Sequence, residues 1–386
     1  MVVTIDNVVN CCGCSACYSS CHSNAIEMKS DSLGFKYPRV DQDRCIECGR
    51  CVSVCPIQNP PLKYNEEQVA YGARLKSQSD LLLSQSGGAS SALVERFISE
   101  GGVVYGAAFD DDFHVIHRCA RTVFEADGFK GSKYVQSDLN DCFSQIYQDL
   151  KAGNRVLFIG TGCQVAGLRN FIPKKMTDNF FCADIVCHCA PSPKIWEDYI
   201  KFIENKYKKR MVLAKFRDKK FGWHSCNESF VFEDCIKSTH FLNGLWEISA
   251  RPSCSKCIAT STKRYGDITF ADFWGWEKHY QEWNDNKGVS LIIVNNPNGY
   301  KLFELARPLL DTIESTLENA LQPQLQHPIK MIPTSSEFAK DYEIHGFRYV
   351  AYKYGNVGCK SKIKNMLVSI YICIREFISK LKYTQK

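Results

Sequence analysis

The sequence lacks the features of a membrane-spanning or secreted protein. No apolar run reaches the roughly 18 residues that a transmembrane helix needs. The first ten residues, MVVTIDNVVN, contain no basic stretch followed by an apolar core, so no secretory signal is recognised. The excess of positive over negative charge is also small: the net charge of +6 is too low to indicate nucleic-acid binding. These absences predict a cytoplasmic protein without a nucleic-acid partner.

Cysteine, by contrast, is abundant, with 21 residues in a chain of 386. A disulfide framework would need an oxidising compartment, for which the sequence gives no sign. Eight of the cysteines form two copies of the spacing C-x2-C-x2-C-x3-C, namely Cys11, Cys14, Cys17 and Cys21, then Cys45, Cys48, Cys51 and Cys55. In two-cluster ferredoxins with this spacing, the fourth cysteine of each run binds the cluster of the other run.

The two runs therefore predict two 4Fe-4S clusters in a small α+β ferredoxin-like domain. The first cluster is assigned to Cys11, Cys14, Cys17 and Cys55, and the second to Cys45, Cys48, Cys51 and Cys21. Zinc fits less well, because zinc sites usually place their ligands in two separated pairs. Cys12 is an additional thiol that we expect to be a neighbour of the ligands, and His22 stands where proline usually follows the fourth cysteine.

Strands and helices alternate after a linker at residues 58–61, which predicts a large α/β body with a mostly parallel or mixed sheet. Strands are expected in VVYGAAF, FHVIHRCA, RVLFIG, FFCADIV, MVLAKFRD, ESFVFED, GDITFADF and GVSLIIVN. Helices are expected in ASSALVERFIS, at residues 139–151 and at residues 194–207, and the acidic turn at residues 110–112 predicts a hairpin.

Four domains follow from this pattern: residues 1–60 with the clusters, residues 65–170 and 171–340 as the two parts of the body, and a helical tail at residues 341–386. The stretch at residues 362–382 has an apolar face and a basic face. Such a helix packs on its own domain, on a second copy in a homo-oligomer, or peripherally on a membrane.

The clusters need an electron acceptor, and flavin is the usual mediator between single electrons and hydride. Two glycine-containing loops before helices are candidate phosphate sites: Gly160 to Gln164, and Ser86, Gly87 and Gly88. Four further cysteines, Cys163, Cys187, Cys254 and Cys257, can form a third cluster, a zinc site or inert buried thiols. Cys189 competes with Cys187 as the ligand.

Five segments occur in order behind the ferredoxin-like head: GTGCQVAGL, CHCAPSP, FRDKKFGWH, RPSCSKC and GDITFADFWGW. Together they resemble the beta-subunit family of coenzyme F420-dependent hydrogenases and dehydrogenases, which includes chlorophyll-pathway reductases. The resemblance implies FAD on the α/β body and a third 4Fe-4S cluster on Cys163, Cys187, Cys254 and Cys257. It places near the flavin Ser86, Gly87, Gly88, Lys133, Tyr134, Thr161 and Gln164.

This chain departs from the family pattern at Gly162, where proline is usual, and at Cys189 and Ala271, where glycine is usual. The substrates of the family therefore cannot be assigned to this chain. His188 and His224 are candidate proton donors, because imidazole titrates near neutrality. Lys219 and Lys220 are expected to face water.

The sequence thus predicts an iron–sulfur flavoprotein oxidoreductase. Its expected partners are ferredoxin or another redox protein and a small-molecule acceptor, either a deazaflavin coenzyme or a biosynthetic substrate related to polysaccharides. The alternatives are a non-catalytic electron-transfer subunit and a zinc-stabilised interaction protein.

Overall fold

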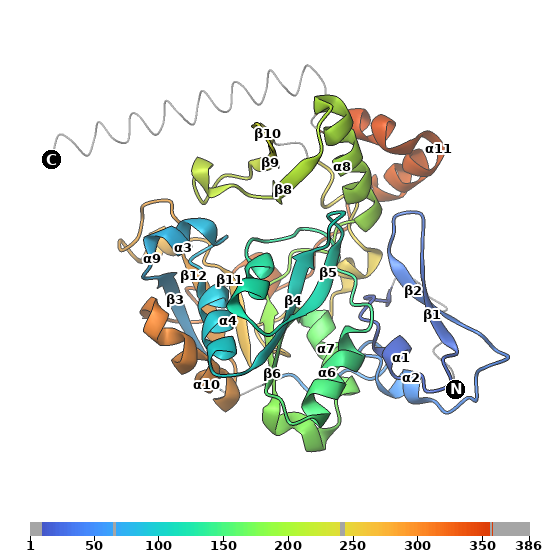
Figure 1. Ribbon diagram of the computed structural model, residues 1–386, viewed down its shortest axis with the longest axis horizontal. Helices are drawn as coiled ribbons and strands as arrows, with labels where there is room; N and C mark the ends of the chain where they lie inside the picture. The colour runs from blue at the N-terminus through green and yellow to red at the C-terminus, as the bar shows by residue number, and fades with distance from the viewer. Residues whose placement is uncertain (1–9, 65–66, 240–243, 356, 358–386) are drawn as a thin grey trace.

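The computed structural model describes residues 10–64, 67–239, 244–355 and 357. Its centre is a mixed sheet of eight strands in the order β13-β3-β12-β11-β7-β6-β4-β5 (Figure 1). The strands are β3 (Val69–Leu75), β4 (Val103–Phe109), β5 (Val115–Ala120), β6 (Val156–Thr161), β7 (Phe180–Ile185), β11 (Ile268–Asp272), β12 (Ser290–Val294) and β13 (Leu310–Ser315).

Five strands of this sheet run in one direction. β4, β6, β7 and β11 are parallel neighbours, and β3 joins them through the antiparallel strand β12. β5 and β13 close the two edges in the opposite direction. The carboxyl ends of β6, β7 and β11 therefore lie side by side with the start of β12, which is where α/β proteins bind ligands.

Each face of the sheet is covered by helices. One face packs against α4 (Ala89–Ser99) and α10 (Pro297–Ala306), with alternate residues of the strands forming the core. The opposite face packs against α6 (Cys142–Lys151) and α7 (Gly162–Phe171) at one end and against Trp276 of α9 (Trp276–His279) at the other. The short helices α3 (Gln78–Leu83) and α5 (Val123–Ala126) lie beside the sheet.

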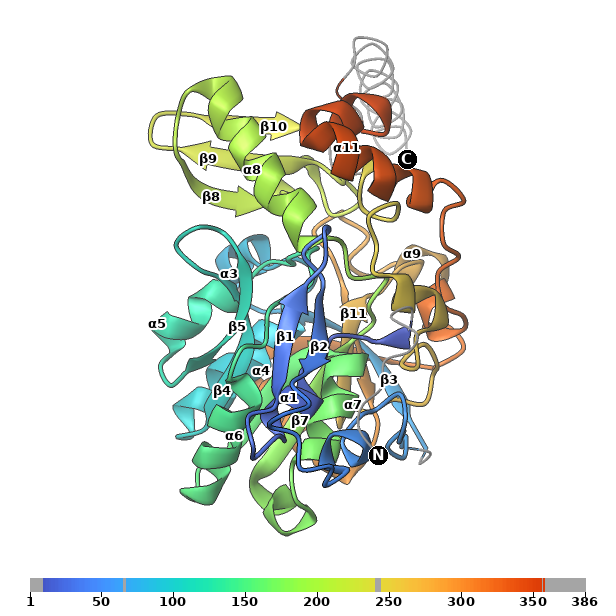
Figure 2. The same cartoon turned by 90° about the vertical axis from the view of Figure 1, so that its right-hand side faces the viewer.

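A second lobe lies beyond the carboxyl edge of the sheet (Figure 2). It contains the small antiparallel sheet β10-β9-β8 and two helices around a core of aromatic residues. The elements are α8 (Pro193–Tyr207), β8 (Met211–Lys215), β9 (Glu228–Phe232), β10 (Ile236–Thr239) and α11 (Ser335–Lys353). Most of this lobe is inserted between β7 and β11, so that the two strands bracket it in the sequence.

The N-terminal cysteine runs fold on the side of the body. Each run contains a one-turn helix, α1 (Ala16–Ser19) or α2 (Arg50–Ser53), and the hairpin of β1 (Ile26–Ser30) and β2 (Lys36–Val40) stands between them. Cys12, Cys14 and Ala16 share one apolar core with α6 and α7. Figure 2 shows α1 lying next to α7, so the cysteine runs are packed on the body and not tethered by a free linker.

The sequence-based prediction of a ferredoxin-like head and a large α/β body is confirmed. The predicted strands and helices are present, and the hairpin at the acidic turn pairs β4 with β5. The sheet is mixed, because β3 and β13, which the sequence pattern did not identify, add antiparallel pairs at one edge.

The proposed domain boundaries stay predictions. α11 runs across residues 340 and 341, and the amphipathic stretch at residues 362–382 lies outside the described residues. No described helix combines the length and the apolar composition that crossing a membrane requires.

Gly167 sets how closely the head approaches α7. A Cβ atom at this position would lie 2.7 Å from Sγ of Cys14 and 3.0 Å from its Cβ. We predict that Gly167→Ala lowers stability by about 1 kcal/mol or more in anaerobic thermal unfolding, because overpacking costs roughly 1–3 kcal/mol. Helix propensity alone favours alanine by up to about 1 kcal/mol, so a variant more stable than the wild type would contradict this packing.

Candidate iron–sulfur and flavin site

The first predicted set of ligands converges in the folded chain. The thiols of Cys11 and Cys55 lie within electrostatic reach of each other, although they belong to different runs. Cys17 interacts with both of them. Cys14 interacts with Cys17 and Cys11, which completes the group of four. The fold therefore brings the fourth cysteine of the second run to the first run, as the spacing predicts.

The second set lines a pocket on the outer side of the head. Cys21, Cys45, Cys48 and Cys51 surround it, and Ile26 and Val40 of the hairpin form its apolar side. Cys48 is exposed, and the neighbouring Ile46 side chain is 71% exposed. This set is thus the one nearest to solvent, whereas in the first set Cys14 is buried against the body and Cys17 is buried within the head.

The third set is built by three loops of the body. Cys163 lies in the first turn of α7, Cys187 follows the end of β7, and Cys254 lies in the 3-10 helix η6 (Pro252–Lys256), just before Cys257. Cys187 interacts electrostatically with Cys163, Cys254 and Cys257. Cys189 interacts with two of these residues, Cys254 and Cys187. The geometry thus favours Cys187 over Cys189 as the fourth member.

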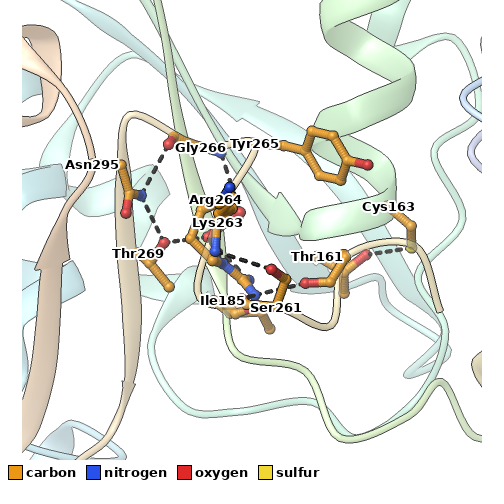
Figure 3. Close-up of polar contacts among 12 residues, drawn as sticks. Thr161, Cys163, Ile185, Ser261, Lys263, Arg264, Tyr265, Gly266, Thr269 and Asn295 are labelled. Carbon is orange, nitrogen blue, oxygen red and sulfur yellow. Dashed lines mark hydrogen bonds and ion pairs between the residues drawn. The ribbon is translucent and has the colours of Figure 1, made fainter. Parts of the chain in front are cut away.

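Arg264 fixes the loop that follows Cys257. Its guanidinium forms an ion pair with the buried Asp184 and donates to the carbonyl oxygens of Ala259 and Ile185, the latter at 3.0 Å. Ile185 is the last residue of β7, two positions before Cys187. Figure 3 shows Arg264 between this strand end and the Thr161–Cys163 turn. One buried cation therefore holds two of the cysteine-bearing loops together.

Arg251 connects the body to the head. Its side chain is 1% exposed, and it donates to the carbonyl oxygens of Cys11 and Lys36, at 2.7 and 2.9 Å. It also donates to Oε1 of Gln136 and lies over the Tyr37 ring at 4.2 Å. Because Arg251 stands three residues before Cys254, the same side chain positions both the first and the third set.

The surroundings of these cysteines fit thiolates that bind a positively charged iron–sulfur core. Burial raises the pKa of Cys17, and neighbouring thiols raise it further, so these sulfurs do not ionise unaided. Within the described chain, Arg251 has no carboxylate partner, and its charge lowers the pKa of Cys11 against the larger effect of burial. A buried cation without a carboxylate is stabilised by an anionic neighbour, and an iron–sulfur cluster held by four thiolates is one.

No three described Cys, His, Asp or Glu side chains are grouped closely enough to hold a single metal ion. The four thiolates of an iron–sulfur cube lie further apart than the ligands of a single ion.

A second polar centre lies at the carboxyl edge of the sheet. Asp272, the last residue of β11, accepts hydrogen bonds from Nη1 of Arg217 and Nε1 of Trp223, both at 2.7 Å. Arg217 also donates to the Tyr134 hydroxyl and lies over the Trp274 ring. Trp223 and Trp274 are stacked with an interplanar angle of 2°. The network joins the sheet edge to the loop after β8.

The residues Ser86, Gly87 and Gly88 lie at the same edge. Ser86 donates to the carbonyl oxygen of Val289, directly before β12, and its own carbonyl accepts from Lys219. The expectation that Lys219 faces water is wrong: its amine donates to Leu81 and Ser86, and burial lowers its pKa to about 8. Lys220 is exposed, as expected.

Thr161 and Gln164 form a capping box at the start of α7, and the Gln164 side chain is 3% exposed. Their hydrogen bonds with each other and with Ser137 orient the turn that carries Cys163. Lys133 donates to the carbonyl oxygens of Gly128 and Lys130. Burial, and to a smaller extent the Arg118 guanidinium, together lower the pKa of Lys133 to about 7.

The two candidate proton donors approach the same centre from different loops. The exposed His224 contacts the Trp223 and Trp274 rings, at centroid distances of 4.9 and 5.8 Å. His188 is solvent-accessible, yet desolvation by surrounding atoms lowers its pKa, while the charge of Asp272 acts in the opposite direction. The structure therefore brings both histidines to the Arg217–Asp272 network.

Several donors around this edge have no hydrogen-bond partner among the described protein atoms. They are Nε of Arg217, Nε1 of Trp246 and Nε2 of Gln85. Trp246 packs on Tyr134 at 4.3 Å, and Gln85 adjoins Ser86, so all three belong to one neighbourhood. Unpartnered buried donors next to aromatic rings fit a planar ligand rich in acceptors, such as a flavin with its phosphates.

Comparison with known families agrees with both parts of the chain. Residues 10–59 match a 4Fe-4S dicluster domain, and residues 153–314 match the family described as the C-terminal part of the beta subunit in coenzyme F420 hydrogenase/dehydrogenase. Over residues 153–314 the chain is therefore similar to this beta-subunit family. The family match spans β6, β7, β11 and β12 and therefore contains all four cysteines of the third set.

Among solved structures, the chain is similar to a subunit of the F420-reducing [NiFe] hydrogenase complex from Methanosarcina barkeri. The identity is 16% and the TM-score is 0.45, over 75% of this chain and 91% of that one. The comparison with curated proteins gave no match.

The sequence analysis missed three residues that organise this candidate site: Arg217, Arg251 and Arg264. Two of them stood inside segments already noted, since Arg217 lies in FRDKKFGWH and Arg251 in RPSCSKC. In those segments the sequence analysis considered His224, the two lysines and the cysteines, but not the arginines. An arginine in a loop usually faces water, and nothing local in the sequence shows that these three are buried.

Arg251 offers a test of how the head is held. We predict that Arg251→Met, which keeps much of the apolar stem and loses the charge and five donors, purifies anaerobically with less iron and sulfide per chain. Arg251→Lys retains the charge without the planar fork and is expected to fall between this variant and the wild type. Full iron content in Arg251→Met would show that the head is positioned without this contact.

Proposed function

We propose that this chain is an iron–sulfur flavoprotein that passes electrons between ferredoxin or a partner subunit and an organic hydride acceptor. The proposal rests on two neighbouring observations. Arg251 connects the first thiol set to the third, and donors without hydrogen-bond partners lie at the carboxyl edge of the sheet. When bound, 4Fe-4S clusters supply one-electron transfer, and FAD supplies both single-electron and hydride transfer.

The proposed roles of the residues follow from their positions. Cys11, Cys14, Cys17 and Cys55 would hold the inner cluster of the head, and Cys21, Cys45, Cys48 and Cys51 the outer one. Cys163, Cys187, Cys254 and Cys257 would hold the cluster of the body. The exposed surface at Ile46 and Cys48 supports docking of a redox partner at the outer set.

The flavin would lie at the carboxyl edge, where Arg217, Trp246 and Gln85 offer donors and Lys133 and Lys219 offer charge. The Asp272 carboxylate orients Arg217 and Trp223 through one hydrogen bond to each. His224 is placed to deliver a proton to an acceptor bound against Trp274, and His188 is the second candidate. A deazaflavin coenzyme is the first acceptor to test, before substrates related to polysaccharides.

The third cluster gives the decisive experiment, because the chain contains a matched control. We predict about 12 iron atoms in the anaerobically purified wild type, as three cubes of four. Cys187→Ala should lose about four of them, whereas Cys189→Ala should lose none. The readouts are iron, acid-labile sulfide and flavin per chain.

Zinc in place of iron and sulfide would support the alternative of a zinc-stabilised interaction protein. Intact clusters without flavin would support a non-catalytic electron-transfer subunit.

Flavin binding should depend on pH through Lys133. The amine, with its pKa of about 7, is charged at pH 6 and largely neutral at pH 8.5, so it attracts the phosphates of FAD only at the lower pH. We expect the affinity of flavin-depleted protein for FAD to fall by about tenfold over this range, measured by fluorescence titration.

The variant Lys133→Met should bind FAD weakly at both pH values. Lys130→Met is the control, since that amine forms an ion pair with Asp127 three positions away. An unchanged pH dependence in Lys133→Met would remove this residue from the flavin site.

A further inference from the structure

The excess positive charge of this chain is concentrated in residues 358–386. This segment contains seven Lys and Arg side chains and one Glu, an excess of six positive charges. The net charge of the whole chain is also +6, so residues 1–357 contain as many Asp and Glu as Lys and Arg. A charge distribution of this kind indicates that an anionic partner binds at this segment.

Apolar side chains recur at helical spacing within the same segment. In residues 362–382 they are Ile363, Met366, Leu367, Ile370, Ile374, Phe377, Ile378 and Leu381. The segment lies outside the described residues, so its two faces are a prediction from the sequence. A segment with one apolar and one basic face is the type that lies in the interface of an anionic membrane. A nucleic acid would use the basic face and leave the apolar face without a partner.

The described chain leads into this segment through the end of α11. Gly346 interrupts the helix with a φ of 74°, and the turns that follow it are amphipathic. Phe347, Val350 and Ala351 are buried in the aromatic core of the second lobe. The inner side of these turns is therefore occupied, and only their outer side is open to a partner.

That outer side presents two tyrosines and an arginine. Tyr349 and Tyr352 are 42% and 52% exposed, and with Arg348, His345 and Lys353 they line an open hollow. Lys353 is paired with two carboxylates of the same helix, whereas Arg348 forms no ion pair with a described residue. Tyrosine has an apolar ring and a polar hydroxyl, so it suits the boundary between lipid and water.

The position of α11 leaves the head free. Figures 1 and 2 both show α11 at the outer end of the second lobe, away from α1 and α2 of the head. A membrane that contacts α11 would therefore not cover the outer cysteine set.

We propose that residues 362–382 and the outer side of α11 at Arg348, Tyr349 and Tyr352 together form a surface that docks on anionic lipid headgroups. Arg348 has the same charge as the basic segment, which disfavours packing of that segment on this side of α11 and favours an anionic partner for both. The contact is peripheral, because its apolar face is balanced by a charged one. The inference does not depend on the clusters or the flavin of the proposed function.

The test is anaerobic co-sedimentation of the full chain with vesicles. We expect binding to vesicles that contain phosphatidylglycerol, little binding to vesicles of phosphatidylcholine alone, and release as salt is raised. A variant with Lys362→Gln, Lys364→Gln and Lys380→Gln should bind about a hundredfold more weakly, because each cation near an anionic surface strengthens binding by about fivefold.

The matched control removes the same charge elsewhere. Lys151, Lys174 and Lys175 are exposed and form no ion pair with a described residue, so Lys151→Gln, Lys174→Gln and Lys175→Gln together should leave binding unchanged. The pair Tyr349→Ser and Tyr352→Ser tests the described side of the surface and should weaken binding severalfold. Circular dichroism and thermal unfolding show that each variant retains the wild-type fold.

A wild-type protein that does not sediment with the anionic vesicles would overturn the proposal. An equal loss in the control triple variant would also overturn it, because that would assign binding to net charge alone. Unchanged binding in the tyrosine variant would remove α11 from the surface. Binding of a single-stranded RNA that the anionic vesicles cannot displace would identify a nucleic acid instead. A dimer that forms in solution, that the tail substitutions abolish and that binds no vesicles would identify a second copy.

Discussion

The arrangement of this protein depends on one buried guanidinium. Arg251 donates to two carbonyl groups of the head, to Gln136 of the body and to no carboxylate in the described chain, and it stands beside the cysteines of the third set. Burying an uncompensated cation is expensive, so this position is favourable only where negative charge gathers. Thiolates bound to metal would supply that charge on both sides, and the contact that fixes the head therefore supports the proposed clusters.

The remaining organisation follows from the parallel strands. β6, β7 and β11 end at one edge, and the loops that continue from them carry Cys163, Cys187 and Asp272. Two further arginines hold those loops: Arg264 binds the end of β7, and Arg217 binds the end of β11. A site built from separate loops is only as well defined as the contacts between them. Buried arginines suit this task, because one planar group can satisfy several carbonyl oxygens at once.

The proposed cluster sites and the proposed flavin site differ in how their charges are balanced within the polypeptide. Cys14 and Cys17 of the inner set are buried and their pKa values are raised, so the protein brings these two thiols together without stabilising their charged form. The carboxyl edge instead presents donors whose hydrogen bonds are unfilled and two lysines whose charge is easily lost. Both arrangements leave part of their electrostatic balance to a bound group, and in this way binding contributes to stability.

The sequence by itself determined the two ferredoxin-like runs, the exchange of the fourth cysteine between them, and most strands and helices, because these depend on short-range spacing and periodicity. It also identified Cys254 and Cys257 as a pair and named Cys187 as the further ligand, with Cys189 as its competitor. Only the tertiary structure placed Lys219 against carbonyl groups and buried Arg217, Arg251 and Arg264. The physical reason is that a ligand set from distant loops, and the burial of a charge, are decided by contacts between residues far apart in the chain, which no local pattern records.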